Sequence, residues 1–80
     1  MNREAIRETL SEVFEGVFDR PIVLRDEMTA RDVEEWDSVA HVMLILATEK
    51  AFGIRFESVE IANAGTVGEF MSLIEAKQPA

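Results

Sequence analysis

The feature that most restricts how this chain can fold is an apolar segment in its middle, which runs from Ser38 to Phe52. Asp37 can cap the start of a helix there, and Gly53 can end it. We therefore expect a helix over residues 37–52. The stripe expected to face the core consists of Val39, Val42, Leu46 and one side of Met43. Other apolar residues extend nearly all the way round, so this helix is either central in the core or contacts a partner as well.

The segment before this helix has the pattern of an amphipathic helix followed by a long connection. Over residues 2–16, apolar residues recur at steps of three and four, the period of one helical face. We expect this helix to end at Gly16, because Pro21 follows and cannot donate a helical hydrogen bond. Residues 17–36 show no sustained period and are expected to form a loop that its apolar residues pin across the helices. Loops this long in small domains tend to be functional.

Two more helices are expected towards the C-terminus. A short one is expected over residues 57–63. Thr66 and Glu69 form a capping box, which opens a helix over residues 66–77. The fold class is therefore all-α. We expect a single domain over residues 1–80, a small bundle of three longer helices plus one short helix, with a long loop between the first and second helices.

The charge and the lack of cysteine restrict the possible functions. The chain has 16 acidic and 8 basic residues and a net charge of -8, which disfavours binding to nucleic acid or to an anionic membrane. No cysteine is present to form a disulfide or to bind a metal, and no apolar run is long enough to span a bilayer. We expect a cytoplasmic monomer whose partners have basic surfaces, although charge alone is more simply explained by solubility.

Asp37 and Ser38 are the residues best placed for chemistry. Ser38 is expected at a helix N-terminus, where unpaired backbone amides and the positive end of the helix dipole favour a bound or attached phosphate. Asp37 beside it could share a metal ion with that phosphate. Taken alone, however, this dipeptide is more simply explained as a good helix start.

The residues around this dipeptide form a larger pattern. The segment Trp36-Asp37-Ser38-Val39 leads into an apolar helix that ends Glu49-Lys50-Ala51-Phe52-Gly53-Ile54. This pattern resembles the acyl carrier protein family, in which the corresponding helix begins Asp-Ser-Leu and typically closes Glu-Glu-Phe-Gly. The resemblance covers nearly the whole chain, because the first helix, the long loop, the short third helix and the last helix all follow the family's order.

The resemblance implies a covalent cofactor on Ser38. In this family the serine carries 4'-phosphopantetheine, which a Mg²⁺-dependent phosphopantetheinyl transferase takes from coenzyme A, and Asp37 matches the aspartate that presents the serine and the metal during loading. The thiol of the arm carries an acyl group as a thioester to enzymes of fatty-acid, polyketide or specialised lipid biosynthesis. The expected protein is a non-catalytic carrier with no resident metal.

The resemblance also implies where partner enzymes dock. The expected partners are the transferase, an acyl-loading ligase or synthase, and acyl-transfer enzymes, which offer basic surfaces to the second and third helices. The candidate contact residues are Val39, Met43, Glu49, Glu57 and Glu60. Each of these glutamates is equally well explained as an ordinary solvated carboxylate.

The second helix departs from the family pattern in ways that indicate a specialised carrier. Val39 replaces the usual Leu after the serine. His41 and Met43 occupy positions that are acidic or small and polar in carriers of fatty-acid synthesis, and Lys50 and Ala51 replace two of the usual glutamates. This helix is therefore less negative and more apolar than in a housekeeping carrier, and we expect its own set of partners.

Two other functions remain as alternatives. An aminoacyl or peptidyl carrier shares the modified serine, but such carriers tend to be less acidic and to have a Gly-Gly before it. An unmodified helical adaptor would have the same fold. A Ser38/His41 hydrolase is rejected, because the chain has no Gly-x-Ser-x-Gly turn. The segment from Asp26 to Asp32 lacks the oxygen spacing and the central glycine of a calcium loop.

Overall fold

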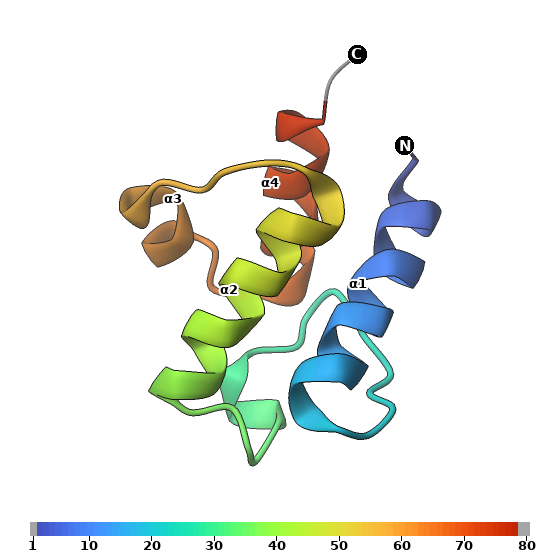
Figure 1. Cartoon of the computed structure of the whole chain (residues 1–80), viewed down its shortest axis with the longest axis vertical. Helices are drawn as coiled ribbons and strands as arrows, with labels where there is room; N and C mark the ends of the chain where they lie inside the picture. Colours follow the sequence, from blue (N-terminus) through green and yellow to red (C-terminus); the bar gives the residue numbers. More distant parts are fainter. Residues whose placement is uncertain (1, 79–80) are drawn as a thin grey trace.

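The computed structural model describes residues 2–78, which form four α-helices and one turn of 3₁₀ helix. Their bounds are α1 Arg3–Phe18, η1 Ala30–Asp32, α2 Ser38–Phe52, α3 Ser58–Asn63 and α4 Val67–Lys77. No strand occurs among the described residues, so the expected all-α class with three longer helices and one short one is confirmed. α1 packs against both α2 and α4, and α3 lies at the edge of the bundle (Figure 1).

The ends of α1 are fixed by local hydrogen bonds. Asn2 Oδ1 accepts from the N–H of Ala5 at 2.8 Å, so Asn2 is the N-cap. The helix continues past Gly16, where we expected it to end, as far as Phe18. Burial of the Phe18 ring in the core outweighs the cost of about 1 kcal/mol for a glycine inside a helix. Asp19 then ends the helix in a left-handed conformation with φ 58°.

The buried side of α2 is not the stripe that we expected. Leu44, Thr48 and Phe52 are its buried residues, and the expected core positions are between 50% and 69% exposed: Val39, Val42, Met43 and Leu46. Because α2 is apolar nearly all the way round, its pattern does not favour one face. The hydroxyl of Thr48 donates to the carbonyl of Leu44 at 2.7 Å, which allows this polar side chain to be fully buried.

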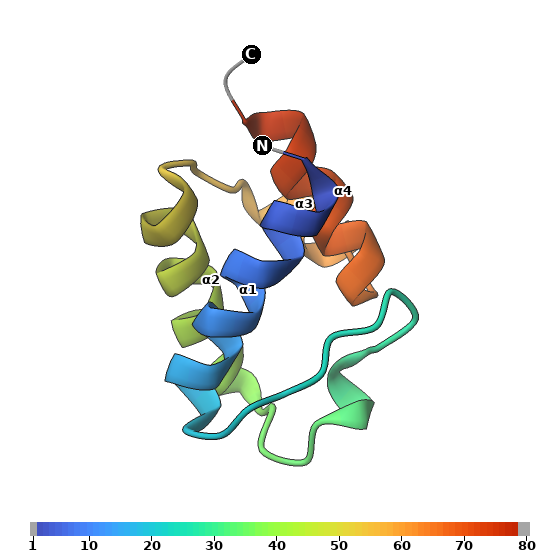
Figure 2. The ribbon, with the colours of Figure 1, turned by 90° about the vertical axis from the view of Figure 1, so that its right-hand side faces the viewer.

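The long loop between α1 and α2 is an ordered layer of the domain. Its buried apolar residues are Ile22, Leu24, Met28 and Val33. The N–H groups of Val67 and Gly68 donate to the carbonyls of Met28 and Asp26 at 2.8 and 2.9 Å, which joins the loop to the start of α4. Figure 2 shows the loop running from the end of α1 past this point to the start of α2.

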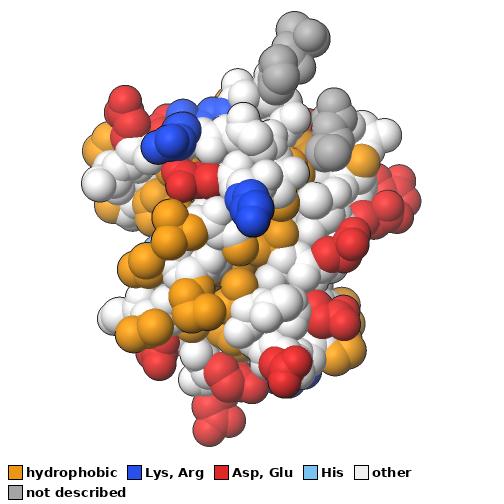
Figure 3. All heavy atoms as spheres, viewed as in Figure 1, with side chains coloured by type: hydrophobic (Ala, Val, Ile, Leu, Met, Phe, Trp, Pro, Cys, Tyr) orange, Lys and Arg blue, Asp and Glu red, His pale blue; other side chains and the backbone are white. Residues whose placement is uncertain are grey.

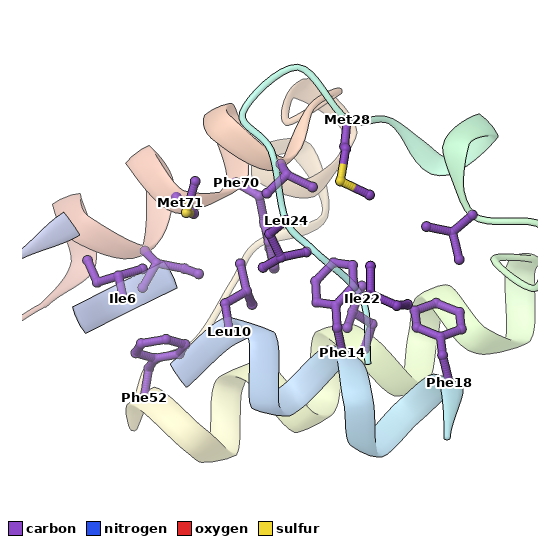
Figure 4. Close-up of a cluster of buried hydrophobic side chains, with 14 of the residues drawn as sticks. Ile6, Leu10, Phe14, Phe18, Ile22, Leu24, Met28, Phe52, Phe70 and Met71 are labelled. Atoms are coloured by element: carbon purple, nitrogen blue, oxygen red, sulfur yellow. The ribbon is translucent and has the colours of Figure 1, made fainter. Parts of the chain in front are cut away.

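The core lies between this loop and the helices. Four residues of α1 form one continuous buried face at helical spacing: Ile6, Leu10, Phe14 and Phe18. Figure 4 shows this face opposite Leu24 of the loop and Phe70 and Met71 of α4. Among the helices described here, none is long and apolar enough to cross a membrane. The start of α2 lies beside an aromatic cluster of Phe14, Phe18 and Trp36.

Candidate functional site

Ser38 is the first residue of α2, and Asp37 is its N-cap. Asp37 Oδ1 accepts from the N–H of Ala40 at 2.8 Å, and the carbonyl of Asp37 accepts from the N–H of His41 at 2.9 Å. These two bonds fix the first turn of the helix. The side chains of Asp37 and Ser38 are both exposed, so the serine hydroxyl is accessible to an enzyme that approaches this end of the bundle.

Ser38 lies at the edge of a shallow surface hollow. The hollow is lined by Ala30, Trp36, Asp37, Ser38, His41 and Val42. Two aromatic residues therefore share this hollow with Ser38, one from the loop before α2 and one from α2 itself. The hollow is open to solvent, which leaves room at the serine for a bulky attached group.

Trp36 and His41 form a contacting pair in the wall of this hollow. Trp36 Nε1 donates to His41 Nδ1 at 3.1 Å, and the two ring planes are inclined by 25° with centroids 6.1 Å apart. Trp36 also packs edge-on against Phe14, with centroids 5.4 Å apart, and at a tilt against Phe18. The tryptophan thus anchors the loop to α1 while it holds the imidazole.

The contact between Trp36 and His41 is the part of the site that we did not expect from the sequence. The sequence pattern that indicates this contact is local. Trp36 precedes the N-cap and His41 is the fourth residue of the helix, which are the two positions that pack together in a hydrophobic staple. An aromatic residue at each position is the sequence pattern of such a contact.

An apolar pocket of about 210 Å³ lies on the far side of the pair, between α2, α3 and the start of α4. It is lined by Ala30, Trp36, His41, Leu44, Ile45, Ile61, Ala64, Gly65, Thr66, Val67 and Phe70. Three of these residues, Ala30, Trp36 and His41, also line the hollow at Ser38. The serine and the pocket are therefore neighbours, separated by the aromatic pair.

The expected apolar contact residues lie on the open side of α2. Val39 is 69% exposed and Met43 is 50% exposed. Figure 3 shows that hydrophobic side chains gather over α2 on this face of the molecule. Among the expected acidic contacts, Glu57 is also exposed. All three are accessible to a partner, and Glu57 is also the N-cap residue of α3.

The other two acidic candidates are engaged within the domain. Glu49 Oε2 accepts from the N–H of Phe56 at 2.8 Å, which ties the segment after α2 back to the helix. Glu60 Oε1 accepts from the N–H of Glu57 at 2.8 Å and lies 2.9 Å from Lys77 Nζ. The hydrogen bond from Lys77, followed by that from Glu57, holds the pKa of the Glu60 carboxyl below its usual value. Both carboxylates therefore have structural contacts that solvated ones lack.

Over residues 2–78, no group of three or more His, Cys, Asp or Glu side chains is arranged to hold a metal ion.

The site defined by the geometry consists of an exposed serine at the start of a helix, an aspartate that caps this helix, and an apolar pocket next to them.

The architecture is similar to that of a known carrier. The solution NMR structure of the holo acyl carrier protein from Geobacter metallireducens matches with a TM-score of 0.84 and 35% sequence identity, over 89% of this chain and 83% of that one. No family model matches the sequence, and a search of curated proteins found no significant match. A bundle of this class with this identity over most of both chains defines a carrier protein. The chain belongs to the acyl carrier protein family.

Proposed function

We propose that this protein carries acyl groups as thioesters on a 4'-phosphopantetheine arm attached to Ser38. The observation that carries the proposal is the exposed serine at the first position of α2, capped by Asp37, in a chain 35% identical to a holo acyl carrier protein. The arm, when attached, supplies a terminal thiol that holds the acyl group. The protein supplies the position of the arm and the surface that partner enzymes recognise.

The residues around Ser38 suit a phosphate ester. The first turn of α2 has backbone N–H groups without helical acceptors, and the positive end of the helix dipole lies there. Both features stabilise a negative charge on the serine oxygen. Asp37 Oδ1 is used by the cap, so the second carboxylate oxygen is the one available to a Mg²⁺ ion brought by the transferase. We assign to Asp37 the presentation of serine and metal.

Loading is a phosphoryl transfer from coenzyme A. Ser38 Oγ forms a bond to the phosphorus that bears the pantetheine, and the bond from this phosphorus to the bridging oxygen breaks. Adenosine 3',5'-bisphosphate leaves with that oxygen, and the proton of the serine hydroxyl passes to a base of the transferase. The carrier contributes an accessible hydroxyl on a fixed helix turn, which is the positioning that such a transfer requires.

The pocket next to Ser38 favours an acyl cargo over an aminoacyl one. Its wall is formed mostly by aliphatic and aromatic side chains from α2, α3 and α4. An ammonium group that entered it would lose its hydration without gaining a charged partner, whereas an alkyl chain would gain from burial. We therefore propose fatty-acid, polyketide or specialised lipid biosynthesis as the setting. The apolar exposed side of α2 supports a specialised member.

The attachment is tested by intact-mass spectrometry after incubation with coenzyme A, Mg²⁺ and a broad-specificity phosphopantetheinyl transferase. We expect one phosphopantetheinyl group on the wild type and none on Ser38→Ala. The matched control is Ser58→Ala, because Ser58 is also exposed and is the first residue of α3, and this variant should be loaded like the wild type. Absence of any addition to the folded wild type would favour the unmodified adaptor.

The cargo class is tested on the loaded protein. Fatty-acid ligases and amino-acid ligases are supplied separately with their substrates, and the loaded fraction is measured by mass. We expect productive loading by the fatty-acid ligase. Preferential loading by the amino-acid ligase would replace the acyl carrier with an aminoacyl carrier.

We also propose that partners with basic surfaces contact Val39, Met43 and Glu57, which are the exposed members of the candidate set. Charge reversal in Glu57→Lys should lower kcat/KM for loading more at low salt than at high salt, because salt screens surface charges. Val39→Ser and Met43→Ser should lower kcat/KM for loading at both low and high salt. Val23→Ser is the matched control, since Val23 is 82% exposed on the first loop. Equal rates for all variants would remove these residues from the docking surface.

A further inference from the structure

Ser38 lies between Trp36 and His41 in the sequence. In the structure these two residues form the boundary between the hollow at Ser38 and the apolar pocket. Both side chains line the hollow and the pocket. A group attached to Ser38 reaches the pocket from the hollow, so these two rings stand where its path begins. Ala30 is the third residue common to both spaces, and its methyl group is too small to act as a barrier.

Trp36 is the fixed half of this boundary. Its ring lies edge-on against Phe14 at 85°, and its backbone N–H donates to the carbonyl of Val33 at 3.1 Å. The adjacent Glu35 accepts two hydrogen bonds from Arg20, at 2.8 and 2.9 Å, which fasten the loop to the residues that follow α1. Displacement of the tryptophan would therefore break contacts on several elements.

His41 is the half that can move. Its side chain is partly buried, and the hydrogen bond from Trp36 Nε1 is its one side-chain hydrogen bond among the described residues. A change of the His41 rotamer breaks this bond and the contact between the rings and leaves the helix intact. Loss of the imidazole would join the hollow and the pocket into one larger space.

We propose that the Trp36/His41 pair determines which acyl groups the pocket accepts, by closing the pocket off from the hollow and so limiting the length of the chain that it can shelter. This inference rests on the proposed function, because it concerns a cargo carried on the arm at Ser38. Trp36 sets the position of this boundary and His41 closes it. The hydrogen bond between the rings keeps the imidazole in place until a chain displaces it.

The test compares cargoes on the same arm. The transferase loads butanoyl-, octanoyl- and dodecanoyl-phosphopantetheine from the corresponding acyl coenzymes A onto wild type, His41→Ala, His41→Asn and Lys50→Ala. Lys50 is exposed at the other end of α2 and lines neither space, so its truncation is the matched control. Hydroxylamine cleavage of each thioester, followed by intact mass, measures how well the cargo is sheltered.

In the wild type we expect octanoyl to be sheltered better than dodecanoyl. In His41→Ala this preference should fall by about fourfold, the factor that corresponds to burial of one more CH₂ group of the longer chain in the joined space. His41→Asn should restore most of the preference, because its Oδ1 can accept from Trp36 in place of Nδ1. Lys50→Ala should match the wild type. Equal preferences in His41→Ala and wild type, with all proteins folded and loaded, would overturn the inference and leave the proposed function standing.

Trp36 gives a second measurement on the wild type alone. It is the single tryptophan of the chain, so its emission reports on the boundary directly. Octanoyl loading should change the emission relative to the protein with an unacylated arm, since the chain displaces His41. An unchanged emission would contradict the inference even if His41→Ala proved too unstable to compare. Failure to load the wild type would instead refute the proposed function, and this inference with it.

Discussion

Single residues decide how closely the first loop can approach α4. Gly68 lies in the first turn of α4, and its N–H donates to the carbonyl of Asp26 at 2.9 Å. A Cβ at position 68 would lie 3.0 Å from both Cβ and the carbonyl oxygen of Asp26. Ordinary carbon contacts are longer than this. A glycine at this position therefore lets the loop pack directly on the helix.

We predict that Gly68→Ala destabilises the protein by about 1–3 kcal/mol, the usual cost of overpacking, although alanine is the better helix former. Gly16→Ala is the matched control. Gly16 is also helical, but a Cβ there meets nothing within 4 Å, so this change should stabilise by about 0.5–1 kcal/mol. Urea denaturation of both variants measures the difference. A Gly68→Ala protein as stable as Gly16→Ala would show that the loop is not held close.

At the scale of elements, the long loop is fastened to α1 by charged side chains. Arg7 contacts Asp26 at 2.7 Å, and its hydrogen bond is the main cause that lowers the pKa of this carboxyl. Further along the loop, the hydrogen bond from Arg20 is the main cause that lowers the pKa of Glu35 from 4.5 to about 2. All four side chains are partly exposed, so solvent limits the strength of these pairs.

The Glu35 carboxylate makes stability depend on pH in a defined direction. Its pKa is lower in the folded state than in the unfolded one, so the unfolded chain binds more protons between about pH 4.5 and about pH 2. The stabilisation is therefore fully present above this range and is lost as the pH falls through it. We predict that Glu35→Gln is less stable than wild type at neutral pH and that the difference shrinks in acid.

Melting temperatures at neutral pH and at about pH 3 test this prediction, since the latter lies inside the range set by the two pKa values. Glu8→Gln serves as the control, because Glu8 is exposed on α1 and should show no such convergence with wild type. A constant difference between Glu35→Gln and wild type at both pH values would mean that the Arg20 contact adds no stability.

Element starts and the buried face of α1 were predictable from the sequence, whereas the buried face of α2 was not. The capping roles that we assigned to Asp37 and Thr66 depend on neighbours within four residues, and each accepts the expected hydrogen bond. The buried face of α2 depends on which helices lie beside it. Its uniform apolar composition gave no period from which to choose, so the expected stripe was assigned to the wrong side.

In the candidate site, too, local features could be predicted from the sequence and features that depend on distant residues could not. The position of Ser38 at a helix start was predicted from the local sequence pattern. The contact between Trp36 and His41 could have been predicted in the same way, because both residues belong to one helix start. The pocket could not be predicted, because its wall comes from α2, α3 and α4 together. The internal contacts of Glu60 were also hidden, since Lys77 is distant from it in sequence.

At the scale of the whole molecule, the pocket is a gap in a small core. A domain of this length buries only about 60% of its unfolded surface, and an unfilled apolar space loses contacts that a filled one would have. One wall of this space is α3, a helix of 6 residues. An acyl chain that enters the pocket would therefore complete the core at its weakest side.

We predict that octanoyl loading stabilises the protein relative to the form with an unacylated arm. After the cost of ordering the chain, about 1 kcal/mol should remain, which raises the melting temperature by about 4–8 °C. Ala64→Leu places extra carbon in the pocket wall, so it should raise the stability of the unacylated protein and remove most of the gain from loading.

Ala62→Leu is the control for Ala64→Leu. Ala62 is exposed on α3, and Ala64 is the C-cap of this helix, so the Ala62→Leu variant should keep the full gain. Calorimetry on unacylated and octanoyl-loaded forms of the three proteins measures both effects. If octanoyl loading leaves the wild-type melting temperature unchanged, the chain stays in solvent. The pocket would then be a structural gap that the cargo does not use.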